Sequence, residues 1–371
     1  MSDTWLHTPA GKPRARALGI PFDGTPGPLN AVTDVGGVEV GYCTLIEGDG
    51  PLVIGQGPVR TGVTALLPRG RTGAKTPCWG GAFSMNGNGE LTGMAWLQET
   101  GQCDGPVTIT NTHSVGLARD ATIRWVVQRL GPPGAAPEWG LPVAGETYDG
   151  YLNDINGFHV SEAHVFAALD DARGGAIEEG SVGGGTGMIA YEFKGGSGTA
   201  SRGVNCAGVD AMLGVLLQAN FGRRDQFTVA GVPVGRAIPD GRFMSRDQGS
   251  VIGVMVTDAP LLPHQLQRLA RRMALGIARS GSIAGHHSGD LFLALSTGNT
   301  EVVVAEGRPQ RADFLPDADL DPLFEATIQA TDEAVLNAMV ANADMTGRDG
   351  NTVLALPHDR VIEILSAHGR V

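Results

Sequence analysis

The most constraining feature of the sequence is the run 251–256, in which no residue carries a polar side chain. A strand with such a continuous apolar run needs cover on both faces, because neither face is suited to water. Helical patterns supply that cover. In 263–280, apolar side chains from Leu266 to Ile277 recur every three or four residues and form one apolar stripe. The sequence therefore predicts an α/β protein of the α+β type, in which helices cover layered sheets.

Short β-type runs bounded by glycine, proline or asparagine recur along the chain and alternate with helical patterns. Glycine is dense, with 56 of 371 residues, but 42% of the residues are hydrophobic and no three-residue repeat is present, which excludes a collagen-like or disordered chain. The predicted strands cover 38–44, 61–67, 91–97, 107–112, 188–193, 212–218, 251–257, 291–296 and 301–305, and the predicted helices cover 114–130, 263–280, 322–342 and 359–368.

Charge and cysteine content exclude several classes of protein. The net charge is −12 and the chain has only three lysines, so an extended basic surface for nucleic acid is not expected. The four cysteines stand far apart and form no CxxC pair, which argues against a zinc site or a disulfide framework. Residues 1–16 lack the apolar core of a signal peptide, and no run of about 18 apolar residues occurs. We expect a cytoplasmic protein with no cofactor and no nucleic-acid or membrane partner.

Gly249 and Ser250 stand directly before the apolar run, where a loop meets a rigid strand. Ser250 Oγ can attack the carbonyl of Gly249, and water can then open the resulting ester, so that the chain is cut and Ser250 gains a free α-amine. Glycine favours this step because it leaves its carbonyl carbon accessible. The new amine, with a reference pKa of about 8, can act as the base for its own hydroxyl. Taken alone, a Gly-Ser pair is more often an ordinary turn.

A second candidate group lies about forty residues further along, before the strand 291–296. Ser288 and Asp290 are two residues apart, and on extended backbone such a pair points to one face. A hydroxyl and a carboxylate side by side can hold an ammonium or α-amine for proton transfer, although a simple turn is the alternative. The neighbouring His286 and His287 suggest a metal site only weakly, because adjacent histidines point apart and no further ligand stands at a suitable spacing.

The third candidate group combines an acidic, aromatic loop with an asparagine that follows a strand. Glu146 can hold a substrate ammonium. Tyr148 and Asn220 can each donate a hydrogen bond to an oxygen that becomes negative during acyl transfer. Each residue also has a structural alternative, since asparagine is a common turn residue and a loop tyrosine often only packs its ring.

Two glycine-rich segments, 183–187 and 195–198, resemble loops that bind phosphate. Neither is followed by the Lys-Ser/Thr pair of a P-loop, and the first precedes a β-type run rather than a helix, which removes the dinucleotide-binding motif as well. A close approach of two backbones is the better interpretation of both segments.

Several blocks of the sequence, taken together and in order, point to one family. They are 29–41, 111–116, GETYDGYLNDI at 145–155, 183–187, 218–222, 249–250, 257–263 and 287–290. In these blocks the chain resembles the family of self-processing L-aminopeptidase/D-amidase-esterases and β-peptidyl aminopeptidases. The resemblance implies a four-layer αββα sandwich like that of N-terminal-nucleophile hydrolases, with a connectivity shared with ornithine acetyltransferases.

The resemblance also assigns a role to each candidate residue. In that family a precursor cuts itself before a serine that matches Ser250, which here would divide a single domain, 1–371, into chains of residues 1–249 and 250–371. Ser250 then becomes the nucleophile. At the position of Asp290, some β-peptidyl members carry glutamate, whereas this chain has the shorter aspartate. The remaining matches are Ser288 and Asp290, which orient the new amine and hydroxyl, Asn220 and Tyr148, which stabilise the oxyanion, and Glu146, which binds the substrate's amino group.

The function that follows is hydrolysis of the N-terminal residue from short peptides, amides or esters, with D- or β-amino acid substrates included in the family's range. Because members of the family form assemblies of processed heterodimers, a homo-oligomer is expected. An alternative is an acyltransferase of the ornithine-acetyltransferase type, in which an amine instead of water takes the acyl group, although that family uses a threonine in a different motif. A third alternative is a small-molecule-binding protein without turnover.

Overall fold

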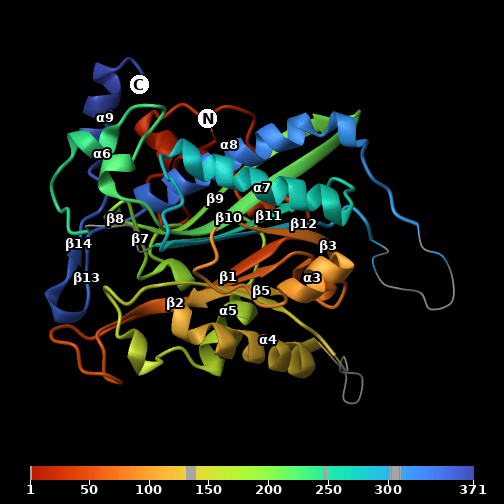
Figure 1. Cartoon of the computed structure of the whole chain (residues 1–371), viewed down its shortest axis with the longest axis horizontal. Coiled ribbons are helices and arrows are strands. Elements are labelled where there is room, and N and C mark those ends of the chain that lie inside the picture. The colour runs from red at the N-terminus through yellow and green to blue at the C-terminus, as the bar shows by residue number, and fades with distance from the viewer. Residues whose placement is uncertain (1, 131–138, 245–248, 301, 303–308, 310) are drawn as a thin grey trace.

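The computed structural model describes residues 2–130, 139–244, 249–300, 302, 309 and 311–371. Two sheets lie face to face between two layers of helices, as Figure 1 shows. Helices α4 (Val115–Leu130) and α5 (Glu162–Asp171) cover the smaller sheet, and α7 (Pro263–Arg279) and α8 (Asp321–Val340) cover the larger one. This arrangement confirms the predicted αββα sandwich.

The larger sheet carries the predicted central strand. Its order is β4-β3-β12-β11-β10-β9, and β11 pairs parallel with β12 and antiparallel with β10. The smaller sheet has the order β1-β2-β5-β6. The strands of the larger sheet are β3 (Cys78–Ser84), β4 (Gln102–Cys103), β9 (Gly196–Cys206), β10 (Val209–Asn220), β11 (Ser250–Thr257) and β12 (Gly289–Ser296), and those of the smaller sheet are β1 (Glu39–Glu47), β2 (Val59–Leu67), β5 (Val107–Asn111) and β6 (Val143–Thr147).

Strand β11 is buried along its whole length, and its two faces belong to different parts of the core. Val251 and Met255 pack in the layer between the larger sheet and the helices α7 and α8. Ile252 and Val254 pack between the two sheets, together with Ile109 of β5. The apolar run is therefore covered on both faces, as the sequence predicts.

Three predicted strands need correction or cannot be assessed. The run 91–97 is not a strand, because helix α3 (Met94–Thr100) occupies most of it between Gly93 and Gly101, whose φ angles of 76° and 72° let the chain turn at both ends. The run 188–193 splits into the short strands β7 (Ile189–Ala190) and β8 (Phe193–Lys194). The predicted strand 301–305 lies outside the described residues except for residue 302.

Strand β9 carries no sequence signal for a strand, because it consists largely of small and polar residues. Those small residues let helix α8 pack directly on its backbone, and a Cβ added at Gly198 would lie only 2.0 Å from the carbonyl oxygen of Ala334. The close backbone approach expected for the segment 195–198 is therefore confirmed.

The remaining elements are short or peripheral. The four predicted helices all form, and in the ranges that the structure describes no helix is both long and apolar enough to cross a membrane. The other helices and strands are α1 (Asp3–Leu6), α2 (Gly70–Gly73), α6 (Val234–Ala237), α9 (His358–Ala367), β13 (Met345–Thr346) and β14 (Thr352–Val353).

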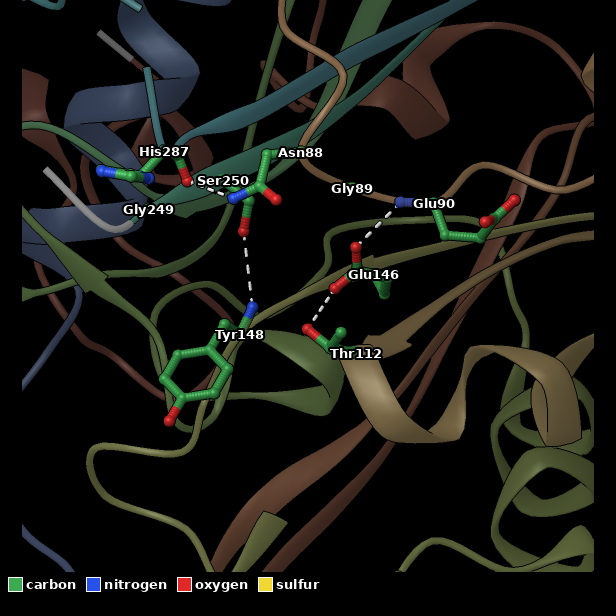
Figure 2. Close-up of a pocket in the computed structure, with 9 residues that line it drawn as sticks. All are labelled: Asn88, Gly89, Glu90, Thr112, Glu146, Tyr148, Gly249, Ser250 and His287. Atoms are coloured by element: carbon green, nitrogen blue, oxygen red, sulfur yellow. Dashed lines mark hydrogen bonds between the residues drawn. The ribbon is translucent and has the colours of Figure 1, made fainter. Parts of the chain in front are cut away.

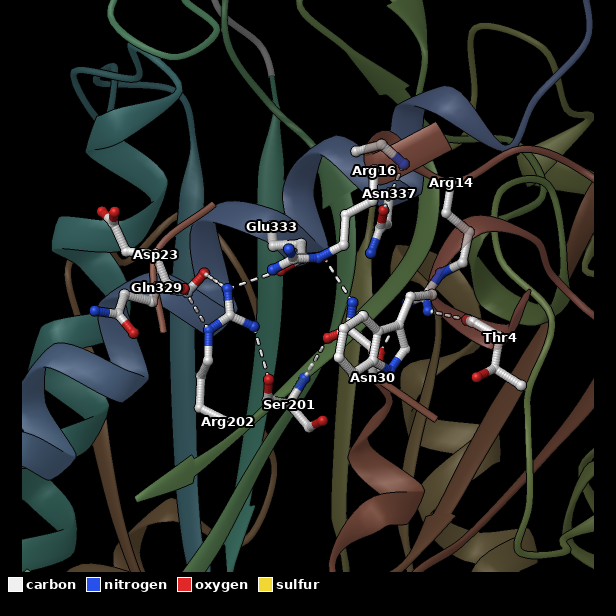
Figure 3. Close-up of polar contacts among 12 residues, drawn as sticks. Thr4, Arg14, Arg16, Asp23, Asn30, Ser201, Arg202, Gln329, Glu333 and Asn337 are labelled. Atoms are coloured by element: carbon white, nitrogen blue, oxygen red, sulfur yellow. Dashed lines mark hydrogen bonds and ion pairs between the residues drawn. The ribbon is translucent and has the colours of Figure 1, made fainter. Parts of the chain in front are cut away.

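A buried ion-pair network ties the N-terminal segment to β9 and α8 (Figure 3). The carboxylate of Glu333, which is fully buried, accepts hydrogen bonds from Arg16 at 2.6 Å, Arg202 at 2.7 Å and Asn30 at 2.7 Å. Burial alone raises the pKa of Glu333, but Arg202, Arg16 and Asn30 outweigh burial and hold that pKa below its ordinary value. The carboxylate therefore stays ionised and joins the N-terminal segment and β9 to its own helix, α8.

The substitution Glu333→Ala is expected to lower the free energy of unfolding by about 3–5 kcal/mol, because it leaves the buried guanidinium groups without their counter-charge. Urea unfolding followed by circular dichroism measures this loss. The control is Glu363→Ala, which removes an exposed partner of Arg360 and should change stability by less than about 1 kcal/mol. Equal effects of the two substitutions would contradict the assigned role.

Candidate active site

One cavity collects most of the candidate residues. It has a volume of about 490 Å³ and lies where the end of β6 meets the start of β11 (Figure 2). The lining residues come from the loop after β3, from the end of β5, from β6 and its loop, and from the starts of β11 and β12. They are Asn88, Gly89, Glu90, Thr112, Glu146, Tyr148, Gly249, Ser250 and His287.

Ser250 is the first residue of the central strand, and its Oγ faces the cavity. The backbone N–H of Tyr148 donates to this Oγ at 3.4 Å. Gly249 must be glycine, because a Cβ at this position would lie 2.2 Å from the carbonyl oxygen of Asn220 and 2.5 Å from Cα of Phe221. The N–H of Gly289 donates to the carbonyl oxygen of Gly249 at 3.3 Å, so the bond between residues 249 and 250 is held with its carbonyl polarised.

Glu146 lies at the end of β6 and is buried. Its carboxylate accepts a hydrogen bond from the backbone N–H of Glu90 at 2.9 Å and a short one from the hydroxyl of Thr112 (Figure 2). Burial raises the pKa of Glu146, and these two hydrogen bonds partly oppose the rise. A carboxylate held in this way at a cavity wall is suited to bind an ammonium group.

The substitution Thr112→Val is expected to move the acid limb of the kcat/KM profile to higher pH. The Thr112 hydroxyl favours the ionised carboxylate, so its loss raises the pKa of Glu146 further. The Glu146 carboxylate then becomes protonated, and stops binding the substrate ammonium, at a higher pH. Initial rates across a pH series measure the shift. The control Thr228→Val removes a hydroxyl that bonds the carbonyl of Arg279, and should leave the profile unchanged. A Thr112 variant with an unmoved limb would exclude this coupling.

Asn220 lies directly opposite Ser250 in the register of β10 and β11. Its Nδ2 donates to the carbonyl oxygen of Tyr148 at 2.9 Å, and its Oδ1 accepts the N–H of Ile189 at 2.8 Å. Both contacts fix the orientation of the side-chain amide beside the nucleophile candidate.

Tyr148 is placed differently from the sequence expectation of a phenol that donates to the oxyanion. Tyr148 as a residue is 44% exposed, and its hydroxyl points away from Ser250 in Figure 2. The group of Tyr148 that faces Ser250 Oγ is the backbone N–H. In this structure the backbone, and not the phenol, is therefore the donor closest to the reacting position.

Ser288 and Asp290 flank Gly289, the residue that pairs with Ser250 on the neighbouring strand. The Ser288 hydroxyl donates to Asp290 Oδ1 at 2.7 Å. The side-chain amide of Asn86 donates to Asp290 Oδ2 at 3.2 Å. The structure thus brings the hydroxyl–carboxylate pair beside the backbone of Ser250, outside the lining of the cavity itself.

Residues of the site that were not found from the sequence include Thr112, Asn86 and Asn88. The two asparagines lie in the loop 85–90 after β3, where Asn86 also bonds the carbonyl oxygens of Ala284 and Gly285, and Asn88 bonds that of His287 at 2.6 Å. The dense asparagine and glycine in this loop were the available signal, but the strand that positions the loop was itself not predicted.

The fold and the site together define a class. The four-layer αββα sandwich is typical of proteins related to N-terminal-nucleophile hydrolases, and the serine hydroxyl and the carboxylate in its cavity are groups that a serine-type peptidase requires.

The chain belongs to peptidase family S58, whose sequence pattern matches residues 30–353. It is 48% identical to the β-peptidyl aminopeptidase BapA of Sphingosinicella microcystinivorans, over 97% of this chain and 93% of the relative. Among solved structures, the L-aminopeptidase D-Ala-esterase/amidase of Ochrobactrum anthropi matches with a TM-score of 0.91 and 48% identity, over 97% of this chain and 99% of that one. A β-aminopeptidase of Burkholderia sp. matches with a TM-score of 0.87 and 43% identity, over 96% and 99% of the two chains.

These matches confirm the family resemblance inferred from the sequence, and the chain is an aminopeptidase of the serine type. They favour a hydrolase over the acyltransferase and over a binding protein without turnover.

Proposed function

We propose that this chain is a self-processing aminopeptidase in which Ser250 first cuts its own backbone and then attacks substrates. The observation that carries the proposal is the joint placement of Ser250 and Glu146 in one cavity. Ser250 also directly follows Gly249, a position that only glycine can occupy. The cut divides the single domain into residues 1–249 and 250–371.

Self-cleavage begins with attack of Ser250 Oγ on the carbonyl carbon of Gly249. The C–N bond breaks, the Ser250 nitrogen takes up the hydroxyl proton, and an ester joins the two residues. Water then opens the ester to leave a carboxylate on Gly249 and a free α-amine on Ser250. The N–H of Gly289, which donates to the Gly249 carbonyl, supports the negative charge that develops on this oxygen.

Substrate hydrolysis repeats this chemistry on another molecule. The α-amine of Ser250 removes the hydroxyl proton, Oγ attacks the substrate carbonyl, and the amine returns the proton to the leaving nitrogen. The backbone N–H of Tyr148 and the Nδ2 group of Asn220 support the oxyanion, and Ser288 with Asp290 orient the α-amine. Water releases the acyl group and regenerates Ser250.

Glu146 restricts the substrate to peptides with a free amino terminus. Its buried carboxylate pairs with the substrate ammonium, and a substrate without that charge leaves the carboxylate unpaired. Amides and esters with a free amine fit the same site.

The substrate range that we propose includes N-terminal β- and D-residues beside L-residues. It rests on the names of the relatives, which are a β-peptidyl aminopeptidase, a β-aminopeptidase and an L-aminopeptidase D-Ala-esterase/amidase. Rates with p-nitroanilides of β-alanine, D-alanine and L-alanine decide between these classes, and failure of all three would refute the range.

Two further parts of the proposal concern the location and the assembly of the enzyme. We place the enzyme in the cytoplasm, and we expect an oligomer of processed heterodimers. Light scattering on purified protein measures the assembly.

Acyl-enzyme trapping tests the mechanism directly. Wild-type protein should separate under denaturing conditions into two chains that begin at the natural N-terminus and at Ser250. A covalent serine inhibitor should add its mass to residues 250–371 alone, and peptide mapping should place it on Ser250. Labelling of another residue, with activity lost in proportion, would overturn the assignment of the nucleophile.

A further inference from the structure

Lys194 is a buried cation that the proposed mechanism does not use. Its side chain has no exposed surface, and its Nζ donates to the carbonyl oxygens of Met188 and Gly195 at 2.8 Å each and of Gly185 at 3.5 Å. In the part of the chain that the structure describes, no carboxylate lies within 4 Å of this Nζ. Three carbonyl acceptors match the three donors of an ammonium group, whereas a neutral amine would offer only two.

The carbonyl of Met188 is one end of a peptide group whose other end contacts the active site. The N–H of that same peptide belongs to Ile189, and it donates to Asn220 Oδ1 at 2.8 Å. A cation that withdraws electron density from a peptide oxygen makes the N–H of that peptide a stronger donor. The positive charge of Lys194 is thus connected to the Asn220 amide through one rigid, planar unit.

The connection continues from Asn220 toward the nucleophile. Asn220 Nδ2 donates to the carbonyl oxygen of Tyr148 at 2.9 Å, and the backbone N–H of Tyr148 faces Ser250 Oγ at 3.4 Å. The Ile189 contact decides which end of the amide is the oxygen, because an N–H donor must meet Oδ1. The amide N–H₂ is thereby directed to the side of Tyr148 and Ser250.

We propose that Lys194 is a positioning residue for acyl transfer, which fixes and polarises the 188–189 peptide so that Asn220 presents its N–H₂ to the oxyanion. This inference rests on the proposed function, because it needs the role assigned there to Asn220. It goes beyond that function by extending the oxyanion machinery to a cation that contacts neither the cavity nor the substrate.

Burial opposes the positive charge of Lys194, and the three carbonyl acceptors are what stabilise it. Burial, together with the like charge of Lys12, lowers the pKa of Lys194 well below its ordinary range, so the site is costly to keep charged. An apolar side chain of similar volume would fill the same space without that cost. The lysine supplies a charge and N–H donors that hold the three carbonyls in a medium of low dielectric constant. An apolar side chain would supply neither.

The test is the substitution Lys194→Met, which keeps the volume and removes the charge and the donors. With processed, active-site-titrated enzyme, kcat should fall between about tenfold and 100-fold, below the full loss of one oxyanion donor, while KM changes by less than about threefold. Lys75→Met, at an exposed lysine, is the control and should keep both constants. Lys194→Gln retains two N–H donors without a charge, so its kcat should lie between those of Lys194→Met and Lys75→Met.

A double-mutant cycle with Asn220→Ala separates positioning from a merely structural role. If Lys194 acts through Asn220, then Lys194→Met should change kcat by less than about twofold once Asn220 is alanine. Where a variant accumulates as uncut precursor, the same cycle is measured on the rate of self-cleavage.

Each outcome of the cycle has a distinct meaning. Losses that multiply, or a Lys194→Met enzyme with wild-type kcat beside an impaired Asn220→Ala enzyme, would overturn the inference and leave the proposed function intact. Full activity of Asn220→Ala would remove the role of Asn220 in the proposed function and, with it, the role of Lys194.

Discussion

Replacement of Ser250 by alanine is expected to leave a single polypeptide of 371 residues with no measurable peptidase activity. The hydroxyl is the attacking group in both self-cleavage and turnover, so its removal stops the two reactions at the same step. Loss of a serine nucleophile reduces kcat by at least about 10⁴-fold. Intact-protein mass measurement and a p-nitroanilide assay on the same preparation follow both effects together.

The matched control is Ser282→Ala, which removes a hydroxyl from the loop before β12 that bonds only the N–H of Ala284 in the described structure. This variant should be cut and should hydrolyse substrate at the wild-type rate. Two chains in the Ser250 variant, or an uncut wild-type protein with full activity, would show that cleavage and catalysis do not share this hydroxyl.

Replacement of Glu146 by glutamine is expected to lower kcat/KM for substrates with a free amine by between about 150-fold and 5,000-fold. The neutral amide keeps the shape of the side chain but removes the charge that pairs with the substrate ammonium, and breaking one partner of a buried ion pair costs about 3–5 kcal/mol. N-acetylated substrates, which carry no such charge, should be poor for the wild-type enzyme and change little. The ratio of the two rates is the quantity to measure.

Glu90→Gln provides the control for this result. Glu90 lines the same cavity and donates its backbone N–H to Glu146, but its exposed side chain does not bond that carboxylate. The preference for a free amine should therefore persist in Glu90→Gln and collapse in Glu146→Gln. A wild-type enzyme that cleaves acetylated and free peptides equally would remove the assigned role of Glu146.

The sequence predicts the fold where a segment's own pattern determines its environment. The apolar run of β11 and the apolar stripe of α7 each require cover, and the layered sandwich follows from that requirement. Prediction failed where tertiary contacts decide the structure. Strand β9 exists because its small residues admit helix α8. Helix α3 was missed for another reason, since its residues largely favour a helix and the two flanking glycines mark its ends.

The site shows the same division. Position before a buried strand makes Gly249 and Ser250 candidates, and spacing does the same for Ser288 and Asp290. The family resemblance is what favours these two pairs over ordinary turns. Thr112 carries no local signal, since its contact with Glu146 spans 34 positions. The orientation of Tyr148 was equally hidden, because a sequence shows which side chain is present but not whether the ring or the backbone N–H faces the nucleophile.

The strand order of the larger sheet fixes when the proposed cut could occur. Strands β11 and β12 would belong to the C-terminal piece, while β10 on one side and β3 on the other would belong to the N-terminal piece. Neither piece alone would keep this sheet whole, and each would present bare strand edges that invite aggregation. If Ser250 cuts the chain as proposed, folding must therefore finish before the cut, and the two pieces would stay paired through β11 with β10 and β12 with β3.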